Sequence, residues 1–236
     1  MKNPLVAIDI QDLHFRWHKH AELTLKIPAL TIHRGEKVFI QGASGSGKTT
    51  LLSLIGGVLL SESGQLCVLN QEIHALRAAQ RDAFRAEHIG FIFQMFNLLP
   101  YLSVLDNVLL PCRFSARRKQ KALSNSSSLE NEAIRLLEHL DIESSQWHAP
   151  ITSLSVGQQQ RVAAARALIG SPELVIADEP TSALDADRRD RFLQLLQNEC
   201  AQQDSTLIFV SHDNALQAYF DRHIHLADIN HAVKAG

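Results

Sequence analysis

Gly42-Ala43-Ser44-Gly45-Ser46-Gly47-Lys48-Thr49 is the most informative segment of this sequence. It fits the pattern GxxxxGK[ST], in which glycines let the backbone wrap closely around phosphate groups and the following helix points its N–H groups at negative charge. An apolar strand-like run precedes it and leucines follow at helical spacing, which is the setting this chemistry needs. The segment predicts a nucleoside triphosphate site, with Lys48 reaching the β- and γ-phosphates and Thr49 ligating Mg²⁺.

Composition narrows the class of protein. A chain of 236 residues fits one large domain or a domain with a modest subdomain. Its net charge of -2, with acids and bases interspersed, gives no electrostatic footprint for nucleic acid. Three distant cysteines without a CxxC pair favour a reducing compartment. The longest apolar stretch, Leu51 to Leu60, is about half of the roughly 20 residues a membrane helix needs, so we expect membrane association only through a partner.

The segment before the phosphate loop predicts an antiparallel edge sheet. Residues Val6 to Phe15 and Leu23 to Ile27 alternate between apolar and polar side chains, as half-buried strands do. Trp17 lies between these strands, where its flat ring could stack on a nucleotide base. The alternatives are that Trp17 packs on the sheet as a hairpin aromatic, or that Phe15 does the stacking.

The middle of the chain is predicted to contain a strand with a polar residue at its end, followed by helices. Ile89 to Phe93 is an apolar strand that ends on Gln94, where ligands bind in open α/β sheets. Residues 95–100 are unusually apolar for a loop, so they either fold inward as core or offer a patch to a partner. Ser103 to Leu110 is typical of a capped helix, and Leu129 to Leu140 of an amphipathic one.

The stretch from Arg113 to Leu129 is expected to be an exposed connection. Its basic cluster at residues 117–121 either contacts anionic lipid head groups or forms a solvated helix face, and the second interpretation is favoured. Residues 77–150 together are interpreted as a helical subdomain inserted in the α/β core.

Polar residues also follow the later strands. Ser155 is a natural N-cap for a long helix, and with Gly157 it forms a possible second anion site. The buried run Leu174 to Ala177 ends in Asp178-Glu179, which suggests Mg²⁺ coordination plus a general base. His212 follows another buried strand and would share one sheet edge with these acids if the strands are parallel.

In order and spacing, these motifs resemble the ATP-binding subunit of an ABC transporter from about Val6 to Leu226. The resemblance implies an α/β fold: a P-loop NTPase core with a mostly parallel sheet, an N-terminal antiparallel β subdomain and an inserted α-helical subdomain. It implies one ABC ATPase domain over residues 1–236, in which the helical subdomain covers about 77–150 and is extended by the signature helix to 170.

The resemblance also assigns roles to residues. Leu154 to Gln158 match the signature LSGGQ, except that Val156 replaces its first glycine, and residues 182–185 match the D-loop. The implied ATP-binding residues are Trp17, Gly42, Ser44, Gly45, Ser46, Gly47, Lys48, Thr49, Thr50, Ser155, Val156, Gly157, Gln158 and Asp185. Thr49, Gln94 and Asp178 would hold Mg²⁺, and Glu179, His212 and Gln94 would be catalytic.

The implied partners are a second copy of the chain, in a head-to-tail dimer around two ATP molecules, and an integral-membrane permease. The chain would then lie on the cytoplasmic face of the inner membrane. Gly90 to Gln94 and Asn97 to Pro100 are similar to the lipoprotein-releasing and macrolide-exporter type, although Ser182-Ala183 is more common in importers. This type implies export or extraction of a lipoprotein, peptide or drug-like substrate. Two alternatives remain: a regulatory ATPase acting through a membrane partner on cell-wall enzymes, and a soluble ATPase of DNA repair or translation.

Overall fold

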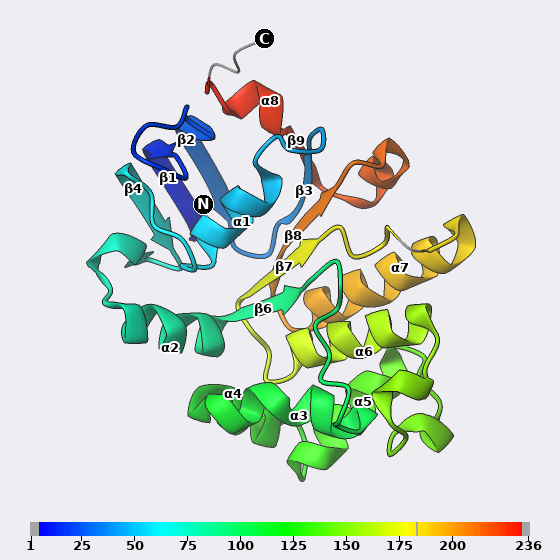
Figure 1. The fold of residues 1–236 in the computed structure, drawn as a ribbon. Helices are drawn as coiled ribbons and strands as arrows, with labels where there is room; N and C mark the ends of the chain where they lie inside the picture. Colours follow the sequence, from blue (N-terminus) through cyan, green and yellow to red (C-terminus); the bar gives the residue numbers. More distant parts are fainter. Residues whose placement is uncertain (1–4, 183, 233–236) are drawn as a thin grey trace. The chain divides into compact units, whose positions relative to one another are not determined.

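A computed structural model describes residues 5–182 and 184–232. Contacts between residues divide the chain into two compact units. The first unit contains the residues up to Arg85 together with those from Ile208 onward, and the second is Ala86–Leu207. In Figure 1 the first unit runs from blue to cyan and resumes in darker orange and red, whereas the second runs from green through yellow to the light orange of α7 (Ala186–Gln202). No helix among the described residues combines the length and the apolar character that crossing a membrane requires.

The first unit is built on two groups of strands. Its elements are β1 (Val6–Phe15), β2 (Leu25–His33), β3 (Lys37–Gln41), α1 (Lys48–Ile55), β4 (Ser63–Val68), β5 (Gln71–Glu72), a 3₁₀ turn at Ile73–Ala75, a 3₁₀ helix at Asn214–Tyr219, β9 (Arg222–His225) and α8 (Leu226–Ile229). Two further elements, α2 (Ala78–His88) and β8 (Thr206–Ser211), contain residues of both units.

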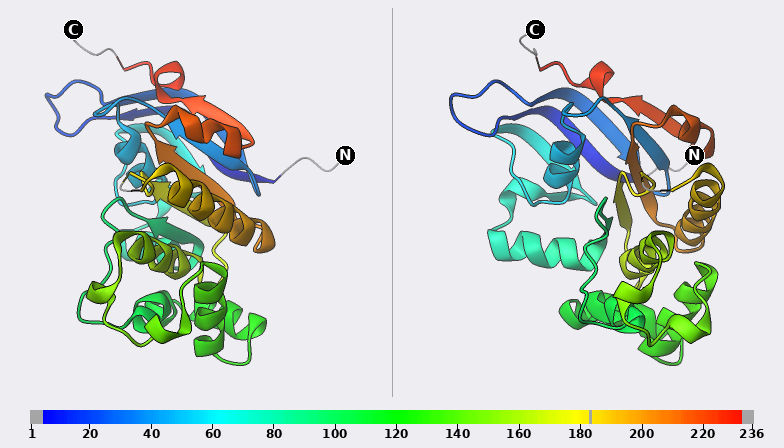
Figure 2. Two further views of the ribbon diagram at one scale, coloured as in Figure 1. Left: turned by 90° about the vertical axis from the view of Figure 1, so that its right-hand side faces the viewer. Right: turned by 45° about the vertical axis from the view of Figure 1, so that its right-hand side comes forward.

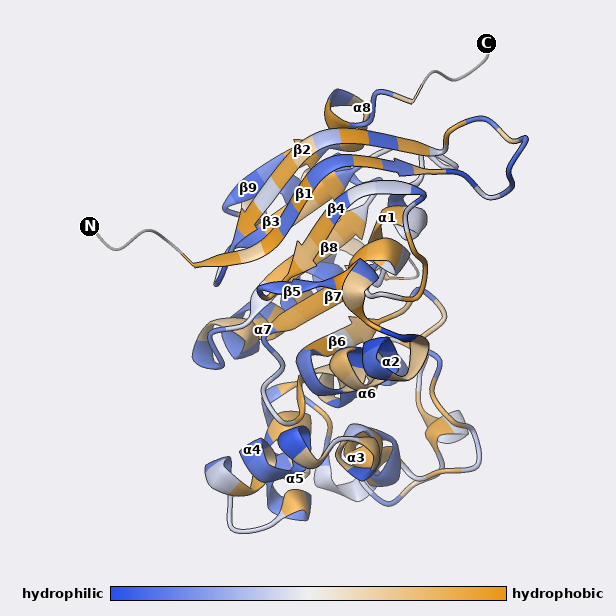
Figure 3. Ribbon diagram, turned by 90° about the vertical axis from the view of Figure 1, so that its left-hand side faces the viewer, coloured by the Kyte–Doolittle hydropathy of each residue, from blue (hydrophilic) through white to orange (hydrophobic). Residues whose placement is uncertain are grey.

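The predicted antiparallel edge sheet is confirmed, with the strand order β2-β1-β4-β5. Buried Ile8, Ile10 and Leu13 of β1 face the core, whereas Asp9 and Gln11 between them are more exposed. Figure 3 shows this alternation as mixed colours along β1 and β2, in contrast to the mainly apolar β7 (Leu174–Asp178) and β8. The loop between β1 and β2 extends well beyond the strands (Figure 2).

Strand β3, which leads into the phosphate loop, is held by aromatic packing. It pairs in parallel with β9. Its Phe39 is fully buried and its ring centroid lies 5.3 Å from Phe220 and 6.3 Å from Phe209. Burial of large rings of this kind contributes much of the stability of a core. The end of β3, and so the start of the loop, is therefore fixed in position.

The second unit consists mainly of helices. Its elements are β6 (Ile89–Ile92), α3 (Val104–Phe114), α4 (Ala116–Asn125), α5 (Leu129–His139), α6 (Val156–Leu168), β7, α7 (Ala186–Gln202) and 3₁₀ turns at Ser144–Gln146 and Ile151–Ser153. Strands β6 and β7 pair in parallel. Helices α3, α4, α5 and α6 pack against one another. Together with the first unit, these elements make the α/β architecture expected from the sequence, with parallel strands, an antiparallel sheet and inserted helices.

The expected exposed connection at residues 113–129 is wrong. Helix α3 continues to Phe114, and α4 follows at once because Ser115 accepts a hydrogen bond from the Arg118 backbone N–H at 3.1 Å. Arg118 is 2% exposed and donates to the Ala167 carbonyl oxygen at 2.9 Å. The sequence did not reveal this role because five basic or amide residues in a row, at positions 117–121, are typical of a solvated helix face.

Candidate active site

The loop after β3 has the backbone shape that a phosphate group requires. Gly45 and Gly47 have φ values of +72° and +102°, in the left-handed region that favours glycine. The Ser46 N–H donates to the Ala43 carbonyl oxygen at 3.1 Å, which curls the loop. Helix α1 then begins at Lys48 without an acidic residue in its first turn. The positive end of its dipole is therefore available to an anion.

Lys48 is folded back over this loop. It is 7% exposed, and its Nζ donates to the carbonyl oxygens of Gly42 and Ala43 at 2.7 and 2.9 Å. A Cβ at Gly42 would lie 2.6 Å from Ser46 Oγ, so a larger residue there would displace that hydroxyl. Ser46 Oγ is buried and has no hydrogen-bond partner within the described part of the chain. A buried cation, an unsatisfied hydroxyl and a tight glycine loop together fit a phosphate chain.

The hairpin that carries Trp17 closes against the phosphate loop. A Cβ at Gly47 would lie 2.8 Å from Leu25 Cδ2 and 3.5 Å from the Thr24 carbonyl oxygen, at the end of this hairpin. Trp17 itself is 55% exposed, and its ring meets buried Phe15 edge-on at 5.3 Å. Phe15 is thus part of the core, and Trp17 is the ring that has a free face.

His212 follows β8 and lies in a segment tied to the start of the same loop. Gln41, the residue before Gly42, exchanges side-chain hydrogen bonds with Asn214 and, at 2.8 Å, with Gln217. The Asp213 N–H donates to Ser211 Oγ at 3.1 Å, which fixes the turn on either side of exposed His212. The structure therefore groups His212 with the phosphate loop inside the first unit.

The acidic pair lies at the end of β7 in the second unit. Residues 174–177 are fully buried and Asp178 is the strand's last residue. Glu179 has a φ of +46°, a conformation that costs a non-glycine residue about 1–3 kcal/mol. Strain of this kind is kept where the surroundings must aim a side chain. Oxygen donors such as Asp178, together with substrate phosphates, are what Mg²⁺ prefers.

The segment after Glu179 leads into α7 through tight turns. The Leu184 N–H donates to the Thr181 carbonyl oxygen at 3.1 Å. Asp185 is the N-cap of α7 and accepts from the Arg188 N–H at 3.0 Å. Of the predicted D-loop, Ala183 lies outside the described residues.

The serine predicted as an N-cap does begin α6. Ser155 and Gln158 form a reciprocal capping box, with distances of 2.9 and 3.3 Å. Val156 is the first residue of α6 and is 50% exposed, and Gly157 follows it. An exposed apolar side chain therefore belongs to the first residue of the helix whose N-terminus was predicted to bind an anion.

Gln94 is exposed just beyond β6, which ends at Ile92 rather than at Phe93. The apolar loop after it combines both expected behaviours: Met95 is 81% exposed, whereas Phe96, Leu98 and Leu99 are partly buried.

Two residues whose structural roles the sequence did not reveal hold this loop. Buried Asn107 accepts from the Leu99 N–H at 2.8 Å and donates to the carbonyl oxygens of Leu99 and Ser103. Arg166 of α6 donates to the carbonyl oxygens of Phe96 and Asn97, both at 2.6 Å. A lone asparagine among apolar helix residues was a usable signal for Asn107.

Comparisons with a family model, with known sequences and with solved structures all match this chain to ATP-binding proteins of ABC transporters. The model of a family described as ABC transporter matches residues 25–182. The lipoprotein-releasing system ATP-binding protein LolD of Syntrophotalea carbinolica is 41% identical over 199 residues, which cover 84% of each chain. The macrolide export ATP-binding/permease protein MacB of Pasteurella multocida is 36% identical over 97% of this chain but only 34% of its own length. The dimeric post-hydrolysis structure of the ATP-binding cassette MJ0796, bound to ADP and Pi, aligns with a TM-score of 0.80 at 33% identity, over 92% of this chain and 93% of that one.

Proposed function

Because this chain belongs to the ABC transporter family and is an ATPase subunit of that family, we propose that it hydrolyses ATP in a dimer to drive a separate membrane permease. The observation that carries the proposal is the phosphate loop, where buried Lys48 lies over the carbonyl oxygens of Gly42 and Ala43 beside the unsatisfied Ser46 hydroxyl. Phosphoryl transfer needs mainly positioning and electrostatic stabilisation, which this loop supplies.

Residues of the first unit are proposed to bind the phosphates and the adenine base of ATP. The Lys48 ammonium exchanges its carbonyl contacts for the β- and γ-phosphates, and backbone N–H groups of residues 44–50 donate to them. The exposed face of Trp17 stacks on adenine. His212 contacts the γ-phosphate and stabilises the charge that develops there.

Hydrolysis is assigned to Glu179, which polarises the attacking water. Its left-handed backbone aims the carboxylate away from the direction that a continued strand would give. Thr49, Gln94 and Asp178 are the proposed Mg²⁺ ligands, with Asp178 acting through water. The bound ion would neutralise charge on the phosphate oxygens.

The dimer is proposed from the family resemblance, which implies that two chains share each ATP site. We assign Ser155, Val156, Gly157 and Gln158, together with Asp185, to the ATP held by the opposite subunit. The solved structure of MJ0796 that aligns with this chain is itself described as dimeric. The exposed Val156 side chain then sits where the signature glycine of other members leaves room, so it slows closure of the dimer.

The permease is proposed to dock on exposed Met95 and its neighbours in the loop after Gln94. The chain would lie on the cytoplasmic face of the inner membrane through this contact. The similarity to proteins named for lipoprotein release and macrolide export supports a substrate of the lipoprotein, peptide or drug-like class, moved by export or extraction.

The test is ATP turnover of the purified chain, alone and with its candidate permease in lipid nanodiscs. We expect the permease to stimulate wild-type turnover, and Phe96→Asp to weaken permease binding. Glu179→Gln should bind ATP normally and turn over at most about a hundredth as fast. Wild-type turnover that ignores every membrane partner would contradict the transport assignment, and normal turnover by Glu179→Gln would contradict the catalytic one.

A further inference from the structure

The loop after Gln94 is held in an unusual shape. Phe96 and Asn97 have φ values of +59° and +51°, so two consecutive residues that are not glycine adopt the left-handed conformation. The Phe96 N–H donates to the Phe93 carbonyl oxygen at 2.9 Å and the Asn97 N–H to that of Met95 at 2.6 Å. Left alone, a loop of L-residues disfavours this arrangement, so something else must stabilise it.

Arg166 supplies that stabilisation. Its two terminal nitrogens each donate to one of the two carbonyl oxygens, at 2.6 Å. The planar guanidinium presents its donors as a rigid fork, and it meets adjacent carbonyls that only the left-handed pair directs toward it. Burial lowers the pKa of the Arg166 guanidinium because it removes water from the cation. The two charge-assisted hydrogen bonds offset part of this desolvation.

A second contact joins the same helix to the strand before Gln94. A Cβ at Gly90 of β6 would lie 2.3 Å from the Ala167 carbonyl oxygen, so strand and helix backbones touch there. Helix α6 is therefore fixed to the β6 segment on both sides of Gln94: at Gly90 before it and at Phe96 and Asn97 after it. All of these residues belong to the second unit.

We propose that Arg166 is a positioning residue, which sets the shape of loop 93–97 and makes it move as one body with α6. Val156 and Arg166 are ten residues apart on one helix, so about 15 Å of rigid helix joins the loop to the Ser155 end. The consequence of this inference rests on the proposed function. When the permease displaces Met95, the rigid helix also displaces the Ser155 end of α6, which is proposed to face the partner's ATP.

The matched control is Arg161, five residues earlier on α6. Its guanidinium donates to Asp141, at 3.0 Å to the carbonyl oxygen and 2.8 Å to the carboxylate. Within the described part of the chain, these hydrogen bonds do not involve loop 93–97. Arg161→Met therefore removes an arginine from the same helix without freeing the loop. Arg166→Lys keeps the charge but can reach both carbonyls less well than a fork does.

Hydrogen exchange of the isolated full chain tests the local claim. We expect Arg166→Met to speed exchange of amides 94–99 by about tenfold, Arg166→Lys to give an intermediate rate, and Arg161→Met to leave these amides unchanged. Exchange that is unchanged in Arg166→Met, or that rises equally along α3 and α6, would overturn the proposal, since the second pattern means loss of general stability.

Permease stimulation tests the consequence. We expect ATP affinity of Arg166→Met to stay within about twofold of wild type, while the ratio of stimulated to unstimulated turnover falls about fivefold. Full stimulation of a variant whose loop exchanges fast would overturn the coupling role. If wild-type turnover does not respond to the permease, the proposed function fails, and the exchange measurement alone decides whether Arg166 sets the loop.

Discussion

Gly45 and Gly47 lie two residues apart in the phosphate loop but are glycine for different reasons. Both have positive φ, yet a Cβ at Gly45 would meet nothing within 4 Å, whereas one at Gly47 would lie 2.8 Å from Leu25 Cδ2. Substitution at Gly45 therefore adds backbone strain alone. Substitution at Gly47 adds a steric conflict with the hairpin that carries Trp17.

We expect Gly47→Ala to lower the free energy of unfolding by about 2–4 kcal/mol, and Gly45→Ala by only about 1 kcal/mol. Urea denaturation measures the difference, and titration with a fluorescent ATP analogue should show the greater loss of affinity in Gly47→Ala. Equal effects of the two substitutions would mean that the hairpin does not press on the loop.

The sequence predicts those features of single residues that depend only on their neighbours in the chain. The predicted N-cap at Ser155 is confirmed, and Gln158 three residues later completes a capping box. The left-handed backbone of Glu179 and the contacts of Arg166 could not be predicted. The contacts of Arg166 reach Phe96 and Asn97, which are distant in sequence, and an arginine in an alanine-rich helix is usually solvated.

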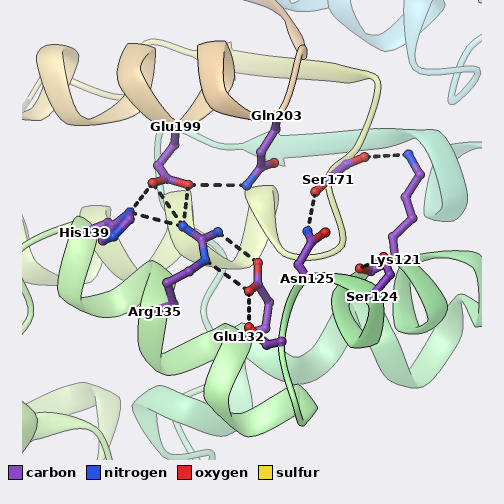
Figure 4. Close-up of polar contacts among 10 residues, drawn as sticks. Lys121, Ser124, Asn125, Glu132, Arg135, His139, Ser171, Glu199 and Gln203 are labelled. Carbon is purple, nitrogen blue, oxygen red and sulfur yellow. Dashed lines mark hydrogen bonds and ion pairs between the residues drawn. The ribbon is translucent and has the colours of Figure 1, made fainter.

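Helices α5 and α7 are joined by a charged network that contains two buried carboxylates (Figure 4). Glu132 and Glu199 have side chains that are 0% and 2% exposed, and Arg135 lies between them at 2.9 and 3.3 Å. His139 Nδ1 adds a contact with Glu199 at 2.5 Å. Hydrogen bonding to Glu132 raises the pKa of Arg135, so the guanidinium stays charged.

We expect Arg135→Leu to destabilise the protein by about 3–5 kcal/mol, because two buried carboxylates lose their shared cation. The control is Arg113→Leu, which breaks an ion pair with Asp106 whose side chains are 55% and 42% exposed and should cost at most about 1 kcal/mol. Denaturant unfolding monitored by circular dichroism measures both. A cost for Arg135→Leu no larger than for Arg113→Leu would show that the carboxylates are reached by water.

A second charged cluster ties α4 to the segment before β7 and makes stability depend on pH. Burial raises the pKa of Glu173, but hydrogen bonds from His88, Arg117 and Lys121 outweigh it and hold that pKa well below its usual range. The stabilisation is complete above the unfolded-state pKa of about 4.3 and is lost as the pH falls toward the folded-state value.

We therefore expect wild-type stability to fall more steeply than that of Glu173→Gln as the pH drops below about 4.3. Urea midpoints measured across this range give the slope, with Glu143→Gln as an exposed control. Parallel pH profiles for wild type and Glu173→Gln would mean that Glu173 is not held in its charged form by this cluster.

The contacts of this cluster explain why the sequence predicts some helices and not others. Helix α3 was predicted from its capping serine, and α5 from apolar residues that recur at helical spacing. Helix α4 was not, since Arg117 and Lys121 bond to Glu173 and Arg118 to Ala167, all some fifty residues away. A basic run alone does not reveal partners at that distance.

At the scale of the whole molecule, the described chain supplies the two halves of the proposed machinery in separate units. The phosphate loop, Trp17 and His212 belong to the first, and Gln94, the acidic pair and the Ser155 end of α6 to the second. The proposed dimer predicts that ATP itself joins two copies, because each nucleotide is held by the loop of one chain and the α6 terminus of the other.

We expect Glu179→Gln with ATP and Mg²⁺ to sediment as a dimer, and the same variant with ADP as a monomer, because only unhydrolysed ATP bridges both surfaces. Ser155→Arg places a bulky cation at the α6 terminus, outside the phosphate loop of its own chain. In the Glu179→Gln background it should abolish the ATP dimer while ATP still binds each monomer. Val156→Gly should instead tighten the dimer, since it removes the exposed side chain that is proposed to slow closure. Analytical ultracentrifugation distinguishes these outcomes. A dimer that forms equally with ADP, or survives Ser155→Arg, would place the subunit contact elsewhere on the molecule.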